Sequence, residues 1–538
     1  MTDRSMRRTG LFRVALSAWH RRLGPREGKG PRHVTPEADR IPFLHKVAYG
    51  LGGFVNNTLA AAIGGMLIIL NLGFGMNPAL VGLASAIPRV TDALTDPVMG
   101  FISDGTRSRW GRRRPYIFIG AIFSGLSYAA LWFLPGGKSE LWYFWYFTIG
   151  STIFYVGYTI FATPWVALGY ELTPDYHERT RLMGVQNFIA QLAYIVSPWF
   201  LWIMTNTAWF ATPAEGARGL AIAVGVVACV VGVIPAIVLR ERRITVAPPA
   251  AGVAVAATTT TTTTATTIAV APAAVASGAA SGASAGAWAA VRRNTGEFFR
   301  GFAATLRTGP YLRLCIATFL VFNGFIMISS FQSYVVIYYV FGGNQELGAR
   351  YTGYAGTLGA ISTFGVIALI TWLATRIGKQ RAFFVSTGLS MVGYALKWVC
   401  YDPARPWLLL VPAPFLAFGL GGLFTLMGAM MADVVDTDEL QTRQRREGMF
   451  GSIFWWVVKV GMAVALAAGG LILNATGFDV ALGGAQAART LYLLRVADVW
   501  IPFIASGIAI WVMAGYPLTE ERAYEVRAEL ERRRAATA

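Results

Sequence analysis

The chain has 538 residues, of which 55% are hydrophobic and 14% charged, and its formal net charge is +18. A soluble domain carries roughly 25% charged residues, so this deficit excludes an ordinary soluble protein and indicates a membrane protein. A positive net charge is also typical of nucleic-acid-binding proteins, so the placement of the charges decides between the two classes.

Residues 1–42 are basic and precede the first long apolar segment. They hold a short, weakly amphipathic stretch at 10–23, but no apolar core of the signal-peptide type. We interpret them as a cytoplasmic tail. Contact with anionic lipid and disorder fit this composition equally well.

Apolar segments long enough to cross a bilayer then recur along the chain, since each spanning helix needs about 20 residues. About twelve spans are predicted, at 45–72, 78–102, 115–135, 141–169, 183–205, 217–239, 311–341, 352–375, 382–400, 406–432, 449–474 and 498–516.

The Lys and Arg residues are distributed unevenly over the loops between these spans. If the N-terminus is cytoplasmic, the cytoplasmic loops and the two tails hold 37 of the 46 basic residues. Three lie in the interior of predicted spans, Arg89, Lys397 and Lys459, and six lie in the opposite loops or at their edges: Lys138, Arg218, Arg350, Arg405, Arg489 and Arg495. This positive-inside bias predicts two cytoplasmic termini in an inner (plasma) membrane and removes the argument for a nucleic-acid partner.

Between the sixth and seventh spans the composition changes. Residues 244–291 carry no charge and consist mostly of Ala, Thr, Gly, Ser and Val. A thirteenth span here would invert the charge bias of the second half, so we predict a flexible linker followed by a short amphipathic helix at 292–309. The predicted organisation is a tail (1–42), a bundle (43–240), a linker region (241–309), a second bundle (310–518) and a C-terminal tail (519–538).

The two predicted bundles repeat each other's loops. A basic Gly-containing loop follows the second span at 109–115 and the eighth at 376–381, and an acid followed by arginines ends the fourth span (Glu171) and the tenth (Asp433). Matching cytoplasmic loops are typical of parallel repeats. We therefore expect an all-α membrane protein of twelve transmembrane helices. Its two pseudo-symmetric six-helix bundles, arranged as in the major facilitator fold, would rock to give alternating access.

The second span carries charges at helical spacing. Arg89, Asp92, Thr95 and Asp96 fall on one face, because residues three and four apart are neighbours on a helix. Two carboxylates one turn apart repel unless a cation or a proton lies between them, and their oxygens suit a hard cation such as sodium. We predict a coupling-cation site there, with Arg89 balancing part of the charge. A structural Arg89–Asp92 ion pair is the alternative.

Two lysines also lie within predicted spans. Lys459 is deep in the eleventh span, too far from the interface to reach water easily, so it should face the cavity and meet an acid or a polar substrate. Lys397 lies near a span end close to Asp402, and we expect it to extend toward the interface.

Polar and aromatic residues in the spans are candidates for binding a substrate. Amides can hydrogen-bond sugar hydroxyls or a neighbouring helix, and aromatic rings can stack on a sugar or pack in the core. The candidates are Asn56, Asn57, Asn187, Gln332, Trp165, Phe424, Trp455, Trp456 and Lys459.

The loop 104–115 is predicted to act as a cytoplasmic latch, because its arginines can bind acids and helix C-termini in one state of the cycle. The predicted charge-balance and gating residues are Arg89, Asp104, Arg109, Arg113, Arg114, Asp433, Asp436 and Arg446. We find no nucleotide-binding motif, no His in the interior of a span and no metal-ligand spacing of the three cysteines. We predict no cofactor, no metal beyond a possible Na⁺, and energy drawn from an Na⁺ or H⁺ gradient.

At these residues the chain resembles the glycoside–pentoside–hexuronide:cation symporter family of the major facilitator superfamily, which includes the melibiose permease. Three blocks carry the resemblance: Asp92-Ala-Leu-Thr-Asp-Pro-Val-Met-Gly100, Tyr158-Thr-Ile with Pro164-Trp165, and the stretches 432–436 and 446–461. The resemblance implies a cation site built from Asp92, Thr95, Asp96 and Thr159, and it matches Lys459 to the family's helix-eleven lysine.

The sugar site departs from this family pattern. The positions that carry charged sugar ligands in the melibiose permease fall here on Asn56, Asn57, Ala162 and Asn187. Melibiose is therefore a doubtful substrate, whereas a glycoside held by amides and aromatic rings fits these residues.

A cation-coupled sugar symporter, working as a monomer among membrane lipids, is the leading hypothesis. The loop Gly111–Pro115 also resembles plant-type sucrose/proton symporters, and the Asp92–Pro97 pattern with Lys459 resembles animal lysophospholipid/sodium symporters. A lipid or other amphiphile is thus the alternative substrate, and a non-transporting sensor is a weaker one. The chain has no motif of an enzyme. The sequence leaves open the substrate, the direction of transport and the choice between sodium and proton.

Overall fold

The computed structural model describes residues 36–106, 108–173, 175–241, 305, 308–443 and 447–537. Every regular element in these ranges is a helix. The predicted N-terminal tail as far as residue 35, the linker after residue 241, most of the amphipathic segment at 292–309 and Arg446 lie outside the described residues.

The first half of the chain forms one group of helices. They are α2 (Phe43–Met66), α3 (Ile68–Leu72), α4 (Pro78–Gly105), α5 (Arg114–Leu131), α6 (Glu140–Glu171), α7 (Tyr176–Val196), α8 (Phe200–Thr205), α9 (Pro213–Gly232) and α10 (Ile234–Val238), with short 3₁₀ turns at Glu37–Asp39 (η1) and Ser197–Trp199 (η2). The predicted first, fifth and sixth spans are each a longer helix continued by a short one.

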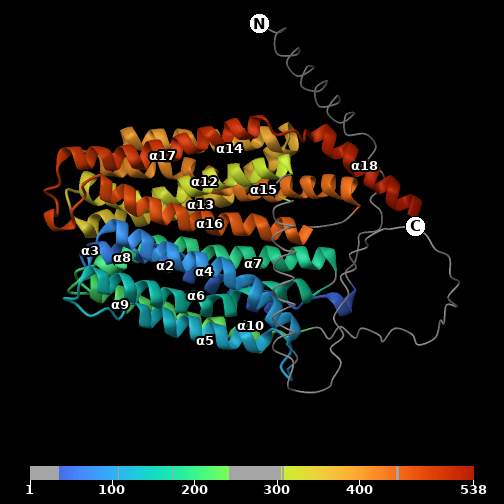
Figure 1. The fold of residues 1–538 in the computed structure, drawn as a ribbon, viewed down its shortest axis with the longest axis horizontal. Helices are drawn as coiled ribbons and strands as arrows, with labels where there is room; N and C mark the ends of the chain where they lie inside the picture. Colours follow the sequence, from blue (N-terminus) through green and yellow to red (C-terminus); the bar gives the residue numbers. More distant parts are fainter. Residues whose placement is uncertain are drawn as a thin grey trace, which may run out of the picture.

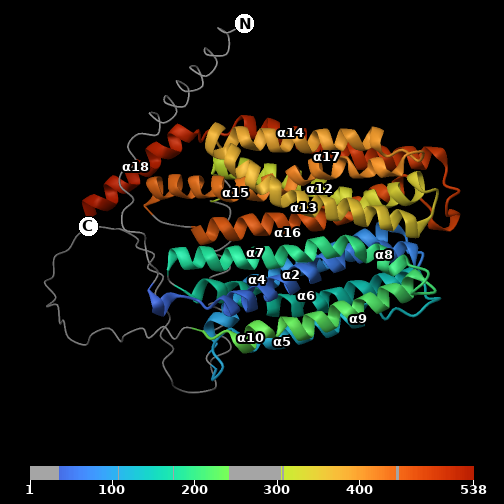
Figure 2. The same cartoon turned by 180° about the vertical axis from the view of Figure 1, so that it is seen from behind.

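The second half forms the other group. It contains α12 (Gly309–Tyr334), a π-helical turn η3 (Val335–Val340), α13 (Gln345–Ile377), α14 (Lys379–Cys400), α15 (Pro412–Thr442), α16 (Glu447–Ala475), α17 (Ala488–Ala514) and α18 (Glu520–Thr537), with 3₁₀ turns at Pro406–Leu410 (η4) and Val480–Leu482 (η5). The two groups lie side by side along the long axis of the molecule, and opposite views agree on this (Figures 1 and 2).

Ten helical segments of the described chain are long and apolar enough to cross a membrane. Two further helices, α4 and α5, pack among them. Helix α4 carries Arg89, Asp92 and Asp96 in its middle. It begins sharply because the Asn77 side chain accepts the amide of Ala79 at 2.9 Å and Pro78 occupies the first turn.

The two ends of the molecule differ. We call the end where α10 finishes and α12 begins the linker end, and the opposite end, which carries the loops after α3, α5 and α8, the far end (Figure 1). At the far end the halves are hydrogen-bonded to each other. Asn77 donates to Asn474 at 3.0 Å, and Tyr334 donates to Asn71 at 3.2 Å. The halves are therefore joined at the far end.

Several arginines assigned to far-end loops lie in helices instead. Helix α17 begins at Ala488, ten residues before the predicted span, and so includes Arg489 and Arg495. Arg495 donates to the Trp398 carbonyl at 2.7 Å and to the Tyr339 hydroxyl at 2.8 Å. In the first half, Arg218 of α9 likewise donates to the Leu134 carbonyl at 3.3 Å. Carbonyls at helix ends accept such donors, which is why these helices accommodate the charge.

Candidate functional site

The candidate cation site lies in the middle of α4. The side chain of Asp92 is fully buried, whereas that of Asp96, one turn closer to the linker end, is 36% exposed. Arg89 is buried one turn toward the far end. Thr95 donates to the Asp92 carbonyl at 3.2 Å, which turns its hydroxyl toward the same cluster. Helical spacing therefore brings the predicted residues together on one face.

Helix α6 adds hydroxyl groups to this cluster. The Thr159 hydroxyl lies 3.1 Å from Oδ1 of Asp92, 3.2 Å from Oδ1 of Asp96 and 3.2 Å from the Thr95 hydroxyl. Thr163, one turn further along α6, donates to Oδ1 of Asp96 at 3.2 Å. Two carboxylates and three hydroxyls thus converge, which is a set of oxygen ligands suited to a hard monovalent cation. The sequence had identified all of them except Thr163.

Lys459 reaches the carboxylates from the other half of the molecule. Its Nζ lies 2.9 Å from Oδ2 of Asp92 and forms a closer ion pair with Oδ2 of Asp96. The sequence predicts that Lys459 meets an acid or a polar substrate, and it groups the lysine with the substrate residues. The structure puts its ammonium group between the two acids, where the predicted coupling cation would bind.

Arg89 completes the charge balance of the cluster. Its guanidinium lies 3.8 Å from Oδ2 of Asp92 and 4.6 Å from the centre of the Tyr155 ring. Asp92 is therefore shared between Arg89 and Lys459, and the shorter contact is to the lysine. Two acids and two bases leave the cluster neutral with no bound ion, so binding a cation must displace the lysine or add a positive charge.

The predicted substrate residues of the first half are mostly engaged in packing. Asn57 donates to the Ala190 carbonyl of α7 at 3.1 Å, and Asn56 donates to Asn57 at 3.3 Å. Trp165 is 4% exposed, donates to the Tyr49 carbonyl at 3.1 Å and stacks on the Tyr49 ring. In this conformation Trp165 has no free ring face for a sugar, so the packing alternative describes it better.

The remaining substrate candidates come from several helices of both halves. Asn187 on α7 is exposed and Gln332 on α12 is half-buried. Phe424 on α15 stacks on Trp455 of α16 with ring centres 6.0 Å apart and planes 15° apart. Trp455 precedes Lys459 by one helical turn, so this exposed aromatic pair belongs to the same stretch of α16 as the lysine.

The loop arginines at the linker end bind groups of their own half. Arg113 pairs with Asp104 at 2.7 Å and with Glu171 at 2.8 Å, and Arg112 pairs with Glu171 at 3.0 Å. Arg114 donates to the Ala236 carbonyl at 2.6 Å. These are the acids and the helix C-terminus that the latch hypothesis required, and all belong to the first half.

The other predicted gating residues come from both halves. Arg109 is exposed in the turn after α4, and Asp436 is half-buried on α15. Asp433 pairs with Lys379 at 2.7 Å within the second half. The sequence missed Lys379 and Glu241, because neither stands out until the loops are folded.

Lys397 does not extend to the interface, and that prediction was wrong. Its side chain is fully buried, its Nζ lies 2.5 Å from Oδ2 of the fully buried Asp498 on α17, and the Tyr401 ring is 5.3 Å away. The error arose because α17 begins earlier than predicted, which placed Asp498 at a span end instead of inside a helix. A buried charge in a membrane protein needs such a partner.

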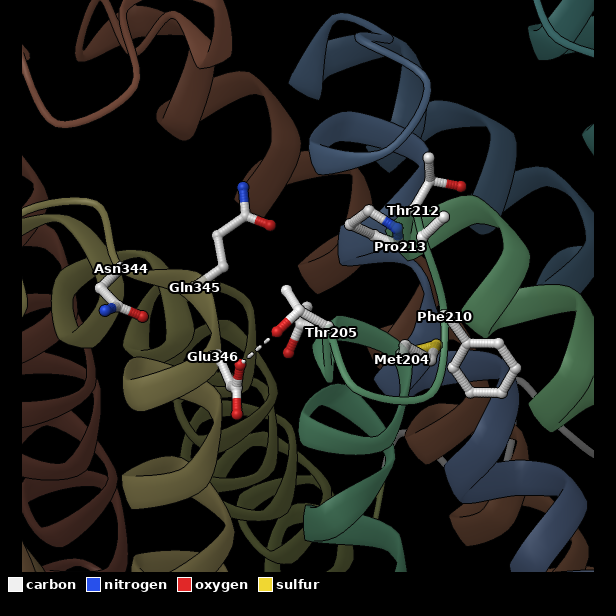
Figure 3. Close-up of a pocket in the computed structure, with 10 residues that line it drawn as sticks. Met204, Thr205, Phe210, Thr212, Pro213, Asn344, Gln345 and Glu346 are labelled. Atoms are coloured by element: carbon white, nitrogen blue, oxygen red, sulfur yellow. Dashed lines mark hydrogen bonds between the residues drawn. The ribbon is translucent and has the colours of Figure 1, made fainter.

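A cavity of about 370 Å³ lies between the halves at the far end, not at the cation cluster (Figure 3). It is bounded by the loop between α8 and α9 and by the start of α13, and the Thr207 hydroxyl donates to Glu346 across it at 3.1 Å. This is a third polar contact that joins the halves at this end. In the described part of the chain, no group of three or more His, Cys, Asp and Glu is arranged to hold a metal ion.

A long helical bundle with buried charges at the meeting point of two halves defines a multi-pass membrane transporter of the major facilitator type. Solved structures agree on the fold: a D-xylose–proton symporter matches with a TM-score of 0.57 at 14% identity, covering 88% of this chain and 98% of that one. An inward-facing bacterial homologue of the lysosomal transporter Spinster matches with a TM-score of 0.56 at 16% identity, covering 88% and 96%.

The family model described as MFS/sugar transport protein matches residues 48–520, and the chain belongs to this family of glycoside–pentoside–hexuronide:cation symporters. It is 23% identical to the isoprimeverose transporter of Lactiplantibacillus pentosus, over 92% of each chain. It is 26% identical to the sodium-dependent lysophosphatidylcholine symporter 1 of Gallus gallus, over 97% of this chain and 95% of that one. The relatives and the fold are those of transporters, not of enzymes.

Proposed function

We propose that the protein is a secondary active transporter that couples an Na⁺ or H⁺ gradient to symport of a sugar or glycoside. The observation that carries the proposal is the ion pair between Lys459 of one half and Asp92 and Asp96 of the other. An incoming cation competes with the lysine for the two carboxylates, so ion binding changes the contact between the halves. A site that both binds the ion and joins the moving parts is what coupling requires.

The identity of the ion follows from the oxygen atoms available. A proton needs only one carboxylate, whereas sodium needs several oxygens at once. Thr159 contacts both acids and Thr95, so the cluster supplies these oxygens without rearranging α4 or α6. This supports sodium as the coupling ion over a proton.

The conformation supports alternating access in a defined direction. The positive-inside bias supports a cytoplasmic linker end, and α4 and α5 would complete a set of twelve spans. The halves are bonded at the far end, and the carboxylate nearer the linker end is the more exposed one. We infer that this state admits water from the cytoplasm, in a plasma-membrane protein that acts as a monomer.

A lysolipid or another amphiphile is the second candidate substrate. The observation that favours it is the packing role of Asn57 and Trp165, because side chains engaged in packing are not available to sugar hydroxyls. The exposed pair Phe424 and Trp455 offers an apolar surface near Lys459. The similarity to a lysophosphatidylcholine symporter points to the same class.

Uptake into proteoliposomes tests the proposal. Labelled pentosides, glucuronides, neutral disaccharides and lysophosphatidylcholine would each be offered under an imposed sodium gradient and under an imposed pH gradient. Accumulation of a sugar under one gradient identifies both the substrate class and the ion. Accumulation of the lysolipid alone would replace the sugar by an amphiphile, and movement of no compound under either gradient would contradict transport of these classes.

A further inference from the structure

The start of α5 is capped by a carboxylate from the end of the same half. Oε2 of Glu241 accepts the amide of Arg112 at 2.6 Å, and Oε1 accepts the amides of Arg113 at 2.7 Å and Arg114 at 3.0 Å. The first amides of a helix have no acceptor within the helix, and the helix dipole favours an anion there. Arg113, the N-cap residue, makes no side-chain cap of its own, so Glu241 supplies the cap.

The surrounding backbone is shaped for this carboxylate. Gly111 has a φ of +105°, which disfavours other residues, and a Cβ added there would lie 2.6 Å from the carboxyl carbon of Glu241. In the opposite direction, Arg114 donates to the carbonyls of Ala236 at 2.6 Å and Ile237 at 3.2 Å. Two contacts thus join the N-terminus of α5 to the C-terminus of α10. In one, a carboxylate that follows α10 accepts amides at the start of α5. In the other, a guanidinium of α5 donates to carbonyls of α10.

The second half has part of this arrangement around α14. Gly378 precedes the helix with a φ of +86°, and a Cβ added there would lie 3.2 Å from Oε2 of Glu520. Gln380 donates to the Met513 carbonyl at the end of α17 at 2.7 Å, as Arg114 does to the end of α10. In each half a glycine with positive φ, a side-chain donor and a following acid thus meet at the linker end.

Glu241 is the last described residue before the linker, and Glu520 is the first residue of α18. We propose that Glu241 is a positioning residue that fixes the start of the linker to the α4–α5 loop, and that Glu520 fixes the start of α18 to the α13–α14 turn. The Glu241 contact holds the loop arginines on their own half. This proposal goes beyond transport and does not depend on what is carried.

Hydrogen–deuterium exchange of the full chain in nanodiscs, with no substrate present, tests the contact. In Glu241→Ala the amides of 112–114 should exchange at least about tenfold faster, because each loses an acceptor that carries charge. Glu241→Gln should be intermediate, and the middle of α5 should be unchanged. Glu215→Ala is the matched control, since Glu215 accepts the amide of Ala211 in its own far-end loop, at 3.2 Å.

Gly111→Ala separates anchoring of the linker from simple capping, because it displaces the carboxylate without changing the linker sequence. We expect faster tryptic cleavage after the exposed Arg240 in this variant. In the double variant Gly111→Ala/Glu241→Ala, the amides of the α4–α5 loop should exchange no faster than in Glu241→Ala alone, because both substitutions remove the same contact. Glu520→Ala should accelerate exchange at 378–382 but not at 112–114. The proposal would be overturned by unchanged loop exchange in Glu241→Ala or by equal acceleration of exchange along all of α5 in that variant. Unchanged tryptic cleavage in Gly111→Ala would also overturn it.

Discussion

At the scale of single residues, the cation cluster depends on one hydroxyl. Thr159 lies within 3.2 Å of oxygens from Asp92, Asp96 and Thr95, whereas Thr163 contacts Asp96 alone. A proton would bind a carboxylate without using this hydroxyl, but sodium would draw on it as a ligand. Replacing the two threonines therefore distinguishes the two ions.

We expect Thr159→Val to raise the sodium concentration needed for half-maximal uptake about tenfold, since a bond to a charged group is worth about 1.5–3 kcal/mol. Thr163→Val, the matched control on the same helix, should have a smaller effect. The measurement is initial uptake at varied sodium concentration with the substrate identified in proteoliposomes. Equal half-saturation in wild type and Thr159→Val would contradict a sodium site at this hydroxyl.

The sequence predicted the residues of this cluster well, because helical spacing alone places Arg89, Asp92, Thr95 and Asp96 on one face. It could not predict which acid Lys459 would meet, since α16 and α4 are brought together only by packing between the halves. Trp165 shows a second limit of prediction from sequence. Its indole is buried by a contact with Tyr49, more than a hundred residues away in sequence, which periodicity does not reveal.

At the scale of helices, α4 and α16 approach closely at the far end through two glycines. A Cβ on Gly82 would lie 2.6 Å from the Leu466 carbonyl oxygen, and one on Gly470 would lie 2.3 Å from the Pro78 carbonyl oxygen. Small residues allow such close packing between helices in membranes. This contact seals the far end beside the Asn77–Asn474 hydrogen bond.

Gly470→Ala should therefore force the two helices apart and destabilise this conformation by about 1–3 kcal/mol, the usual cost of overpacking. The measurement is the Tm of the purified protein in detergent, which we expect to fall by several degrees. Gly451→Ala, on the same helix but with open space around its Cβ position, is the control and should leave the Tm unchanged or slightly raised. A Tm for Gly470→Ala equal to that of Gly451→Ala would contradict the close contact.

Helix boundaries were the weaker part of the sequence prediction. Ten of the predicted spans were found because long apolar segments are unambiguous, but α17 begins ten residues before its predicted start. Arg489, Arg495 and Asp498 made this stretch look like a loop. Arg495 is accommodated by the Trp398 carbonyl and the Tyr339 ring, and Asp498 by Lys397, and these partners come from other helices.

At the scale of the whole molecule, the two halves are joined at the far end and meet again at Lys459. Alternating access requires the far-end contacts to break once in each cycle. Asn77 and Asn474 face each other across this seam with a 3.0 Å hydrogen bond, so cysteines at both positions should form a disulfide under mild oxidation.

We predict that oxidised Asn77→Cys/Asn474→Cys loses transport and that a reducing agent restores it, because the disulfide holds the far end closed. Each single cysteine variant is the control and should transport equally well in both redox conditions. The native cysteines Cys229, Cys315 and Cys400 are partly or fully buried. Full transport by the cross-linked double variant would show that the far end need not open.

The most direct test of the central claim is gradient-driven accumulation by wild type and Asp96→Asn side by side. Asp96 is the exposed member of the acid pair and holds the close contact with Lys459. We predict that wild-type protein accumulates its substrate above the equilibrium level under a sodium gradient, and that Asp96→Asn, folded and inserted normally, only equilibrates it. Accumulation by the variant equal to that of wild type would contradict coupling through this pair.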